Sequence, residues 1–467
     1  MITQIVPTDS NLISNHVPPT NEIISHIFNY LDDGICRPKS WYSGSDKPTK
    51  IASLVTVCRT WTAFGEALLY RNLRLDYGAR ERTKARLQLF NNLQDTSRFC
   101  RYVQCLEIVL PQVCVDEEVV EIIHLLRKAT GFAKQVKISQ ENNGSPDPRL
   151  ISAIVLMRLE TLVVAGCWLQ PIYDHLLRWG DGDALKALRM EDCHQSYYCH
   201  QNDPSIHWAA STDYILPEDR QFSSSLQTIV IVECDFHIKA LYELLRWPAT
   251  LKVLKFLGMV PRRYSKSYGA VSIQPLLDLH AQTLETIGVV CYSSYVSSGG
   301  LPNLSNFSSL RNLTVSHADL FADTPRVACS KLPGSALTHL TIDTGHGQFD
   351  AENARWLTQF AGWRHNGSRP IGLLYVHVAI QSNDKSSHSG FCPGSLDKKF
   401  QSSVQYLSGV RSVAAEYGVH LTWDKIYLTE AEKWIQQTGQ VRYGGDASQQ
   451  INQYAEEKAE EQQTCKT

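Results

Sequence analysis

The stretch LETLVVAGC, residues 159–167, shares its apolar pattern and its final cysteine with LKALRMEDC at 185–193 and LQTIVIVEC at 226–234. All three follow the template L-x-x-L-x-L-x-x-C, where L stands for a large apolar residue. Successive side chains of a strand point to opposite faces, so the L-x-L segment has two inward residues and one outward residue between them. The stretch therefore predicts a strand and a turn that recur along the chain.

Weaker copies of the template extend the array in both directions. Copies without the cysteine begin at Leu251, Leu284, Leu310 and Leu337, and degenerate copies contain Val103, Leu106 and Ile108, Val136 and Ile138, and Ile371, Leu374 and Val376. Most copies are spaced by the roughly 20 to 29 residues of a leucine-rich repeat. One such unit cannot bury its own apolar face, so we expect the copies to stack into a solenoid.

Amphipathic segments between the copies supply the return path from one strand to the next. They are EEVVEIIHLLRKA (117–129), PIYDHLLRW (171–179) and IKALYELLRW (238–247). The predicted fold class is α/β: a curved solenoid over residues 102–428, with parallel strands on the concave face and helices on the convex face. The ninth-position cysteines should lie in the turns, inside the stack.

Two segments of the array are too polar or irregular for the repeat core, and we interpret them as loop insertions at 194–223 and 261–270. Outside the array, residues 1–16 are expected to be disordered, 76–101 to form a linker helix with a solvated face, and 429–467 to form a polar tail.

Two apolar segments precede the array. PPTNEIISHIFNYL (18–31) has a helix start at its prolines and an apolar face that includes Ile23 and Ile27. The second segment, residues 51–75, has apolar stripes on two sides if it is helical, so it needs two packing partners. Residues alone predict a helical cap on a solenoid.

The same two segments resemble the F-box proteins, specifically the fungal F-box proteins that continue into leucine-rich repeats. The matching residues are Pro19, Glu22, Ile23, Ile27, Phe28, Tyr30, Leu31, Leu54, Val57, Cys58, Arg59, Trp61, Leu68, Leu69, Tyr70 and Arg71. The Val-Cys-Arg-x-Trp core is the more specific part. The chain departs from the family pattern by one extra residue between Pro19 and Glu22 and by an insertion at 32–50.

The resemblance implies that an F-box-like helical unit at 17–75 binds the small adaptor subunit of an SCF-type cullin-RING ubiquitin ligase, and through it a cullin. The solenoid would bind a protein substrate, and the chain would be a non-catalytic monomer within the complex. Interfaces concentrate their energy in a few buried anchors. We expect these to be Pro19, Ile23, Ile27, Leu54, Val57, Trp61 and Leu68. The alternative is an interaction scaffold whose N-terminal helices only cap the solenoid.

The outward positions of the strands predict where a substrate binds. In the middle of the array they are mostly small or apolar, and soluble proteins seldom expose such a surface without a use. The predicted substrate groove consists of Val230, Val232, Val253, Leu257 and Val290. In the alternative interpretation, the chain's own segment VHLTWDKIYL (419–428) covers this groove.

Composition gives no support for a nucleic-acid or membrane partner. Lysine and arginine number 45 against 47 acidic residues, so no overall field attracts the chain to polyanions. The longest apolar segment is interrupted by Arg158 and Glu160, and the N-terminus lacks the pattern of a secretory signal. The 13 cysteines are scattered, so we expect reduced thiols in the cytoplasm or nucleus.

Catalytic signatures for phosphate, dinucleotide, zinc-protease and hydrolase sites do not occur in the sequence. The sequence predicts no enzyme and no cofactor. One group has the residue types of a zinc site: Cys193, His194, Cys199, His200 and His207. Its spacing matches no closed zinc site, so we interpret it as a polar loop rather than as a metal site; a zinc-dependent hydrolase is the remaining alternative.

Overall fold

A computed structural model describes the larger part of the repeat region. The described residues are 71–77, 102–111, 114–129, 132–144, 146–167, 176, 184–193, 215–234, 238–258, 273–290, 300–344, 349–366, 372–379 and 393–423. They divide into two compact units, the first made of the described residues up to Glu141 together with Arg149–Leu159, and the second of Asn142–Pro148 and the described residues from Glu160 onward. The first predicted helix and most of the second lie outside the described residues.

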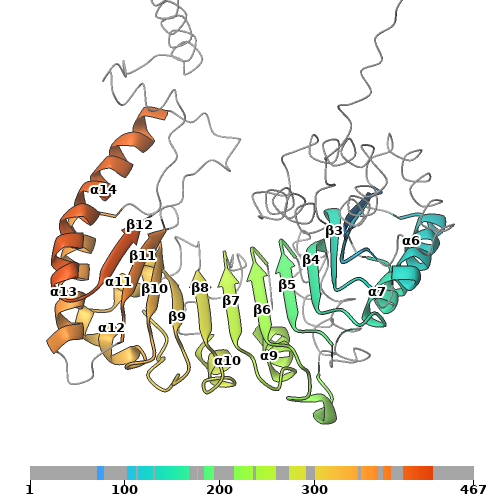
Figure 1. The fold of residues 1–467 in the computed structure, drawn as a ribbon, viewed down its shortest axis with the longest axis horizontal. Helices are drawn as coiled ribbons and strands as arrows, with labels where there is room; N and C mark the ends of the chain where they lie inside the picture. Colours follow the sequence, from blue (N-terminus) through green and yellow to red (C-terminus); the bar gives the residue numbers. More distant parts are fainter. Residues whose placement is uncertain are drawn as a thin grey trace, which may run out of the picture. The chain divides into compact units, whose positions relative to one another are not determined.

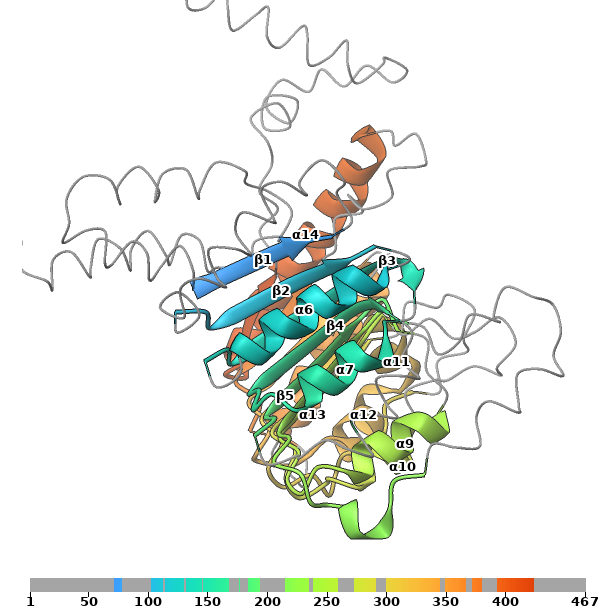
Figure 2. The same ribbon diagram turned by 90° about the vertical axis from the view of Figure 1, so that its right-hand side faces the viewer.

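The first unit contains parallel strands and the helices that follow them. Its elements are β1 (Asn72–Asp76), β2 (Cys105–Leu110), α6 (Asp116–Ala129), β3 (Gln135–Gly144) up to Glu141, and α7 (Pro148–Val155) from Arg149. Strand β2 pairs in parallel with β1 and with β3, which brings Leu73, Leu106 and Val136 into one buried row. Figure 2 shows α6 and α7 side by side.

Helix α6 confirms the return helix predicted at 117–129. Its first turn is acidic, with Asp116, Glu117 and Glu118 at the positive end of the helix dipole. Four apolar side chains at helical spacing are buried: Val119, Ile122, Leu125 and Leu126. Burial of this stripe against the strands holds the helix in place, because each side chain contributes roughly 1.5 to 3 kcal/mol when fully buried.

Strand β1 corrects the prediction of a helix extending to residue 75. Residues 72–76 form a strand, and its alternating Leu73 and Leu75 are buried while Asn72 and Arg74 are exposed. Tyr77, predicted to lie in a solvated linker, is also buried, and its hydroxyl donates to Glu121 Oε1 at 3.0 Å. Alternation with a period of two therefore decides the local structure here, and the repeat sheet begins before residue 102.

The second unit contains a parallel sheet whose strand order from β4 to β12 follows the sequence (Figure 1). Its strands are β4 (Thr161–Cys167), β5 (Ala187–Glu191), β6 (Thr228–Val232), β7 (Val253–Leu257), β8 (Thr286–Val290), β9 (Asn312–Ser316), β10 (His339–Asp343), β11 (Tyr375–Ala379) and β12 (His420–Trp423). Its helices are η4 (Glu218–Arg220), α9 (Ile238–Arg246), α10 (Gln274–Asp278), α11 (His317–Ala322), α12 (Pro325–Lys331), α13 (Ala351–Asn366) and α14 (Pro393–Glu416). Within the described residues, no helix is both long enough and apolar enough to cross a membrane.

In-register pairing stacks the predicted inward residues into continuous buried rows. One row runs through Leu162, Leu188, Ile229, Leu254, Ile287, Leu313, Leu340, Val376 and Leu421, and all of them are buried. A one-residue slip would turn a whole strand's apolar set to the other side of the sheet. The burial of every member fixes the register and confirms the repeat pattern from β4 to β10.

The ninth-position cysteines lie inside the stack, as predicted. Cys167, Cys193 and Cys234 are buried free thiols. The backbone N–H of Cys193 donates to Cys234 Sγ at 3.3 Å, and Cys193 Sγ lies 3.4 Å from the carbonyl oxygen of Val164. The thiols of Cys193 and Cys234 thus connect backbone groups of neighbouring repeats, whereas the Cys167 thiol donates to the carbonyl oxygen of Ala165 on its own strand.

A residue in the left-handed region lies at the carboxyl end of each strand from β4 to β7. Gly166, Asp192, Glu233 and Gly258 have φ values of 60°, 49°, 53° and 70°. The N–H groups of Asp192, Glu233 and Gly258 donate to the last carbonyl of the next strand at 2.8, 2.7 and 2.8 Å. This bend keeps the backbone ladder intact while the chain leaves the sheet.

The last two strands differ from the sequence prediction. The degenerate copy at 371–376 was expected to turn Leu374 inward, but Leu374 is exposed and the buried residues are Leu373, Val376 and Val378. The copy of the template at β11 therefore begins at Leu373, two residues after the predicted start at Ile371. Residues 420–423 form strand β12, with Leu421 buried, where the alternative interpretation expected a covering segment.

The bends predict opposite effects for a matched pair of substitutions. Glu233→Gly should stabilise the second unit by about 0.5 to 1 kcal/mol, because an exposed non-glycine residue in the left-handed region costs roughly 1 to 2 kcal/mol and glycine returns part of this as chain entropy. Gly258→Ala should destabilise it by about 1 to 2 kcal/mol for the same reason. Urea unfolding of both variants measures the difference; equal midpoints would contradict the bend geometry.

Candidate functional site

The side of β4 to β12 that carries the residues between the buried ones is the candidate site; we call it the open face. Its first row, in register across the sheet, consists of Thr161, Ala187, Thr228, Val253, Thr286, Asn312, His339, Tyr375 and His420. Parallel pairing uses backbone groups and does not require a particular residue type at these outward positions. Their side chains can therefore serve binding.

The predicted substrate groove lies in the middle of this face, on β6, β7 and β8. Val230, Val232, Val253 and Leu257 are half-buried, so each keeps part of its apolar surface in water. Val290 is only 1% exposed. It offers almost no surface to a partner, and we exclude it from the candidate surface.

Lys255 and Gly288 shape the floor of this region. A Cβ placed on Gly288 would lie 3.1 Å from Lys255 Cγ and 3.5 Å from Leu257 Cδ2, so both side chains cover the glycine. The aliphatic stem of Lys255 therefore extends the apolar surface. Its ammonium group is the single charge on β7.

Cations flank Val230 in the second row of the open face. Register pairs Val230 with Arg189 of β5 on one side and with Lys255 of β7 on the other. Arg189 also forms an ion pair with Glu191 on its own strand. The predicted groove therefore has an apolar surface next to basic groups, as the outward positions of the sequence pattern already indicated.

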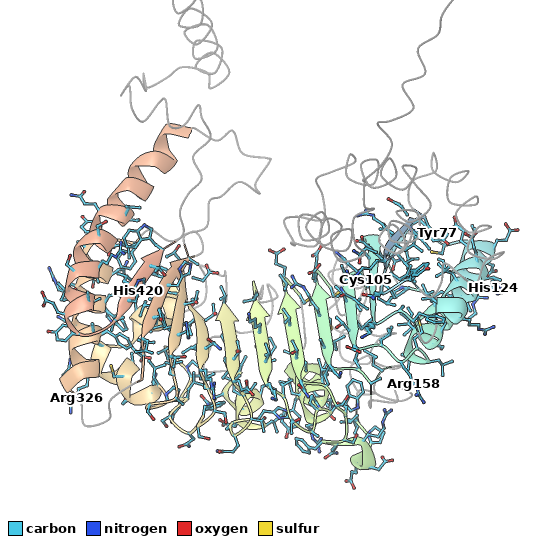
Figure 3. All side chains as sticks on the ribbon, in the orientation of Figure 1. Tyr77, Cys105, His124, Arg158, Arg326 and His420 are labelled. Atoms are coloured by element: carbon cyan, nitrogen blue, oxygen red, sulfur yellow. The ribbon has the colours of Figure 1, made fainter. Side chains whose placement is uncertain are left out.

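A row of rings on β10, β11 and β12 is the part of the open face that sequence reasoning missed. His339 stacks on Tyr375 with ring centroids 4.7 Å apart and 12° between planes, and Tyr375 meets His420 at 5.7 Å. Tyr375 is 46% exposed. Figure 3 shows His420 on its strand. The signal was present in the sequence, since the rings occupy the same position of three successive repeats.

Hydroxyl groups orient two of the imidazoles on these strands. Thr338 Oγ1 lies 2.9 Å from His339 Nδ1, and Thr422 Oγ1 lies 3.0 Å from His377 Nδ1. The imidazoles and Tyr375 give this end of the face aromatic edges with hydrogen-bonding atoms, the composition found at protein interfaces.

The zinc-like cluster is not brought together in the described residues. Of its members only Cys193 is described, and its thiol points to backbone carbonyls within the stack. Burial also raises the pKa of the neighbouring Cys234 thiol, which therefore stays protonated rather than becoming a thiolate ligand. In the part of the chain that the structure describes, no group of histidine, cysteine and acidic side chains could hold a metal ion.

The predicted adaptor-binding residues Pro19, Ile23, Ile27, Leu54, Val57, Trp61 and Leu68 all lie outside the described residues, so their prediction stands on the sequence motif. Comparison with known proteins adds nothing to it: no protein-family model matches the chain, and no curated protein is significantly similar to it.

The open face predicts different responses to two aspartate substitutions. Val230→Asp should change the unfolding free energy little, because the new carboxylate would lie between Arg189 and Lys255 and cross-strand opposite charges contribute roughly 0.2 to 1 kcal/mol. Leu257→Asp should destabilise by about 1 to 2 kcal/mol, because it is paired with Val232 and Val290. Urea unfolding distinguishes them; a larger loss for Val230→Asp would mean that Val230 is core.

Proposed function

We propose that this chain is the substrate-receptor subunit of an SCF-type cullin-RING ubiquitin ligase and is not catalytic by itself. The observation that carries the proposal is the Val-Cys-Arg-x-Trp motif at 57–61, placed directly before a parallel repeat sheet. Its N-terminal helices would bind the small adaptor and its open face a protein substrate. The complex would act in the cytoplasm or nucleus, with one copy of the chain.

The open face supports a protein as substrate rather than a small molecule. Small-molecule sites are concave and bury 70 to 90% or more of their ligand, whereas the outward side chains of β6 and β7 each keep part of their surface in water along two neighbouring strands. A broad face with half-buried valines in the middle and exposed rings on β10 to β12 fits a polypeptide that spans several repeats. Val230, Val232, Val253 and Leu257 remain the proposed apolar contacts, and Tyr375 is added to them.

An interaction scaffold unconnected to ubiquitination is the second candidate function. Solenoids need a cap over their terminal repeat, and apolar helices before β1 could meet that need without an adaptor. The two functions differ in whether the anchors of the N-terminal segment bind another protein. Adaptor capture therefore separates them.

We predict that Trp61→Ala weakens adaptor binding by about 2 to 4 kcal/mol, or roughly 30-fold or more, because buried tryptophans act as interface anchors. The measurement is pull-down and titration of the full chain with recombinant adaptor. Trp363→Ala is the matched control: Trp363 is an exposed tryptophan on α13, next to Arg326, and its loss should leave adaptor binding unchanged.

A melting-temperature comparison completes this test. Lost binding by Trp61→Ala at an unchanged melting temperature supports the adaptor interface. Failure of the unsubstituted chain to capture the adaptor would refute the receptor function and leave the scaffold.

A further inference from the structure

A groove lies between α6 and α7 of the first unit, and none of the residues discussed above as a site lines it. Its volume is about 550 Å³, and its lining consists of Ile123, Arg127, Arg149, Ser152, Ala153 and Leu156. Both views show the two helices next to each other (Figures 1 and 2). Because its lining residues come from both helices, the groove lies between them.

Residue spacing explains the groove. Arg149, Ser152, Ala153 and Leu156 recur at three- and four-residue steps, so they share one face of α7 and its last turn, while Leu150, Ile151 and Ile154 are buried on the other side. Ile123 and Arg127 are likewise four residues apart on α6. The small side chains of Ser152 and Ala153 leave space that larger residues would fill.

The apolar side chains of this surface are unusually exposed for their type. Leu156 is 79% exposed and Val120, one turn before Ile123 on α6, is 59% exposed. A lone exposed leucine needs no explanation, but Leu156 and Val120, together with Ile123 of the groove lining, form an apolar patch. These side chains contribute little to the fold, since most of their surface stays in water.

Charge in the groove is positive at one end. Arg127 makes no ion pair within the described part of the chain and lies at the C-terminal end of α6, beside the Leu156 end of the groove. Arg149, at the other end, is paired with Asp116 at 2.5 Å. The acidic first turn of α6 is about 16 Å from Arg127, at 1.5 Å per helical residue. Among the described residues, no carboxylate lines the groove itself.

We propose that the groove between α6 and α7 binds an amphipathic helix of a protein partner, with its apolar side chains on Ile123, Ala153 and Leu156 and a carboxylate on Arg127. Two parallel helices present a channel that accepts the ridge of a third helix, and such helices bind through apolar residues at i, i+3 or i+4, and i+7. This inference does not depend on the proposed ligase function.

The test uses the full chain and a labelled synthetic helical peptide of 15 residues as the probe. The probe carries leucines at positions i, i+4 and i+7 and two glutamates beside the last leucine; a second probe carries lysines in place of the glutamates. Fluorescence anisotropy measures both. The expected result is saturable binding of the glutamate probe and binding at least tenfold weaker for the lysine probe.

Two substitutions in the groove locate the site. Arg127→Glu should weaken the glutamate probe about tenfold or more and strengthen the lysine probe, which is a reversal that a general loss of folding cannot produce. Leu156→Ser should weaken both probes at an unchanged melting temperature, because the side chain is mostly in water. Arg326→Glu, an exposed arginine on α12 of the second unit, is the matched charge control and should change neither.

Several outcomes would overturn the proposal. They are absence of saturable binding by the glutamate probe, equal binding of the two probes, or no reversal with Arg127→Glu. A large fall in melting temperature for Leu156→Ser would show that another part of the chain already occupies the groove. Loss of adaptor capture has no bearing on any of these readouts, so failure of the ligase proposal and failure of this one are distinguishable.

Discussion

In-register parallel pairing is the constraint on which the rest of this structure depends. Each strand from β4 to β12 satisfies its backbone hydrogen bonds through its sequence neighbours, as shown by pairs such as Leu188 with Ile229 and Leu254 with Ile287. A strand cannot shift by one residue without exposing its apolar set. Stability therefore comes from repeated nearest-neighbour contacts and not from one central core, and each repeat depends on the next for its burial.

This constraint divides the residues of a repeat into two classes. Inward residues such as Ile231 and Phe256 are fully buried and must be apolar. Residues between them are free of that requirement, and they differ along the sheet from valine and lysine on β6 and β7 to histidine and tyrosine on β10 and β11. The outward residues are therefore the ones that indicate function, because the fold does not require their residue types.

The sequence predicted the strands best where the template is complete. From Leu159 to Leu340 the L-x-x-L-x-L spacing placed each strand and its buried side, and helices α6 and α9 agree with their predicted ranges. Prediction failed where local patterns compete. Leu73 and Leu75 follow a helix-like apolar segment, and Ile371 and Leu374 match the template two residues before the true frame. In both places the pairing with a neighbouring strand determines the local structure and its frame. A local sequence pattern contains no information about that pairing.

The binding surfaces were likewise predictable from the sequence only in part. Alternation identified the outward residues of β6 and β7 correctly, but it could not show that Val290 is buried or that Tyr375 lies between two imidazoles, because both depend on which residues are neighbours in space. The groove of the first unit was likewise hidden, since Arg127 and Leu156 are far apart in sequence and meet only because α6 and α7 return beside each other. A solenoid places residues of successive repeats in contact at a fixed interval, so its binding surfaces become visible in sequence only after the frame of every repeat is known. The two-residue shift at β11 illustrates this. Tyr375 points outward in both frames, but the predicted frame would place it in register with Thr341, whereas the observed frame pairs it with His339 and His420 and so forms the row of rings.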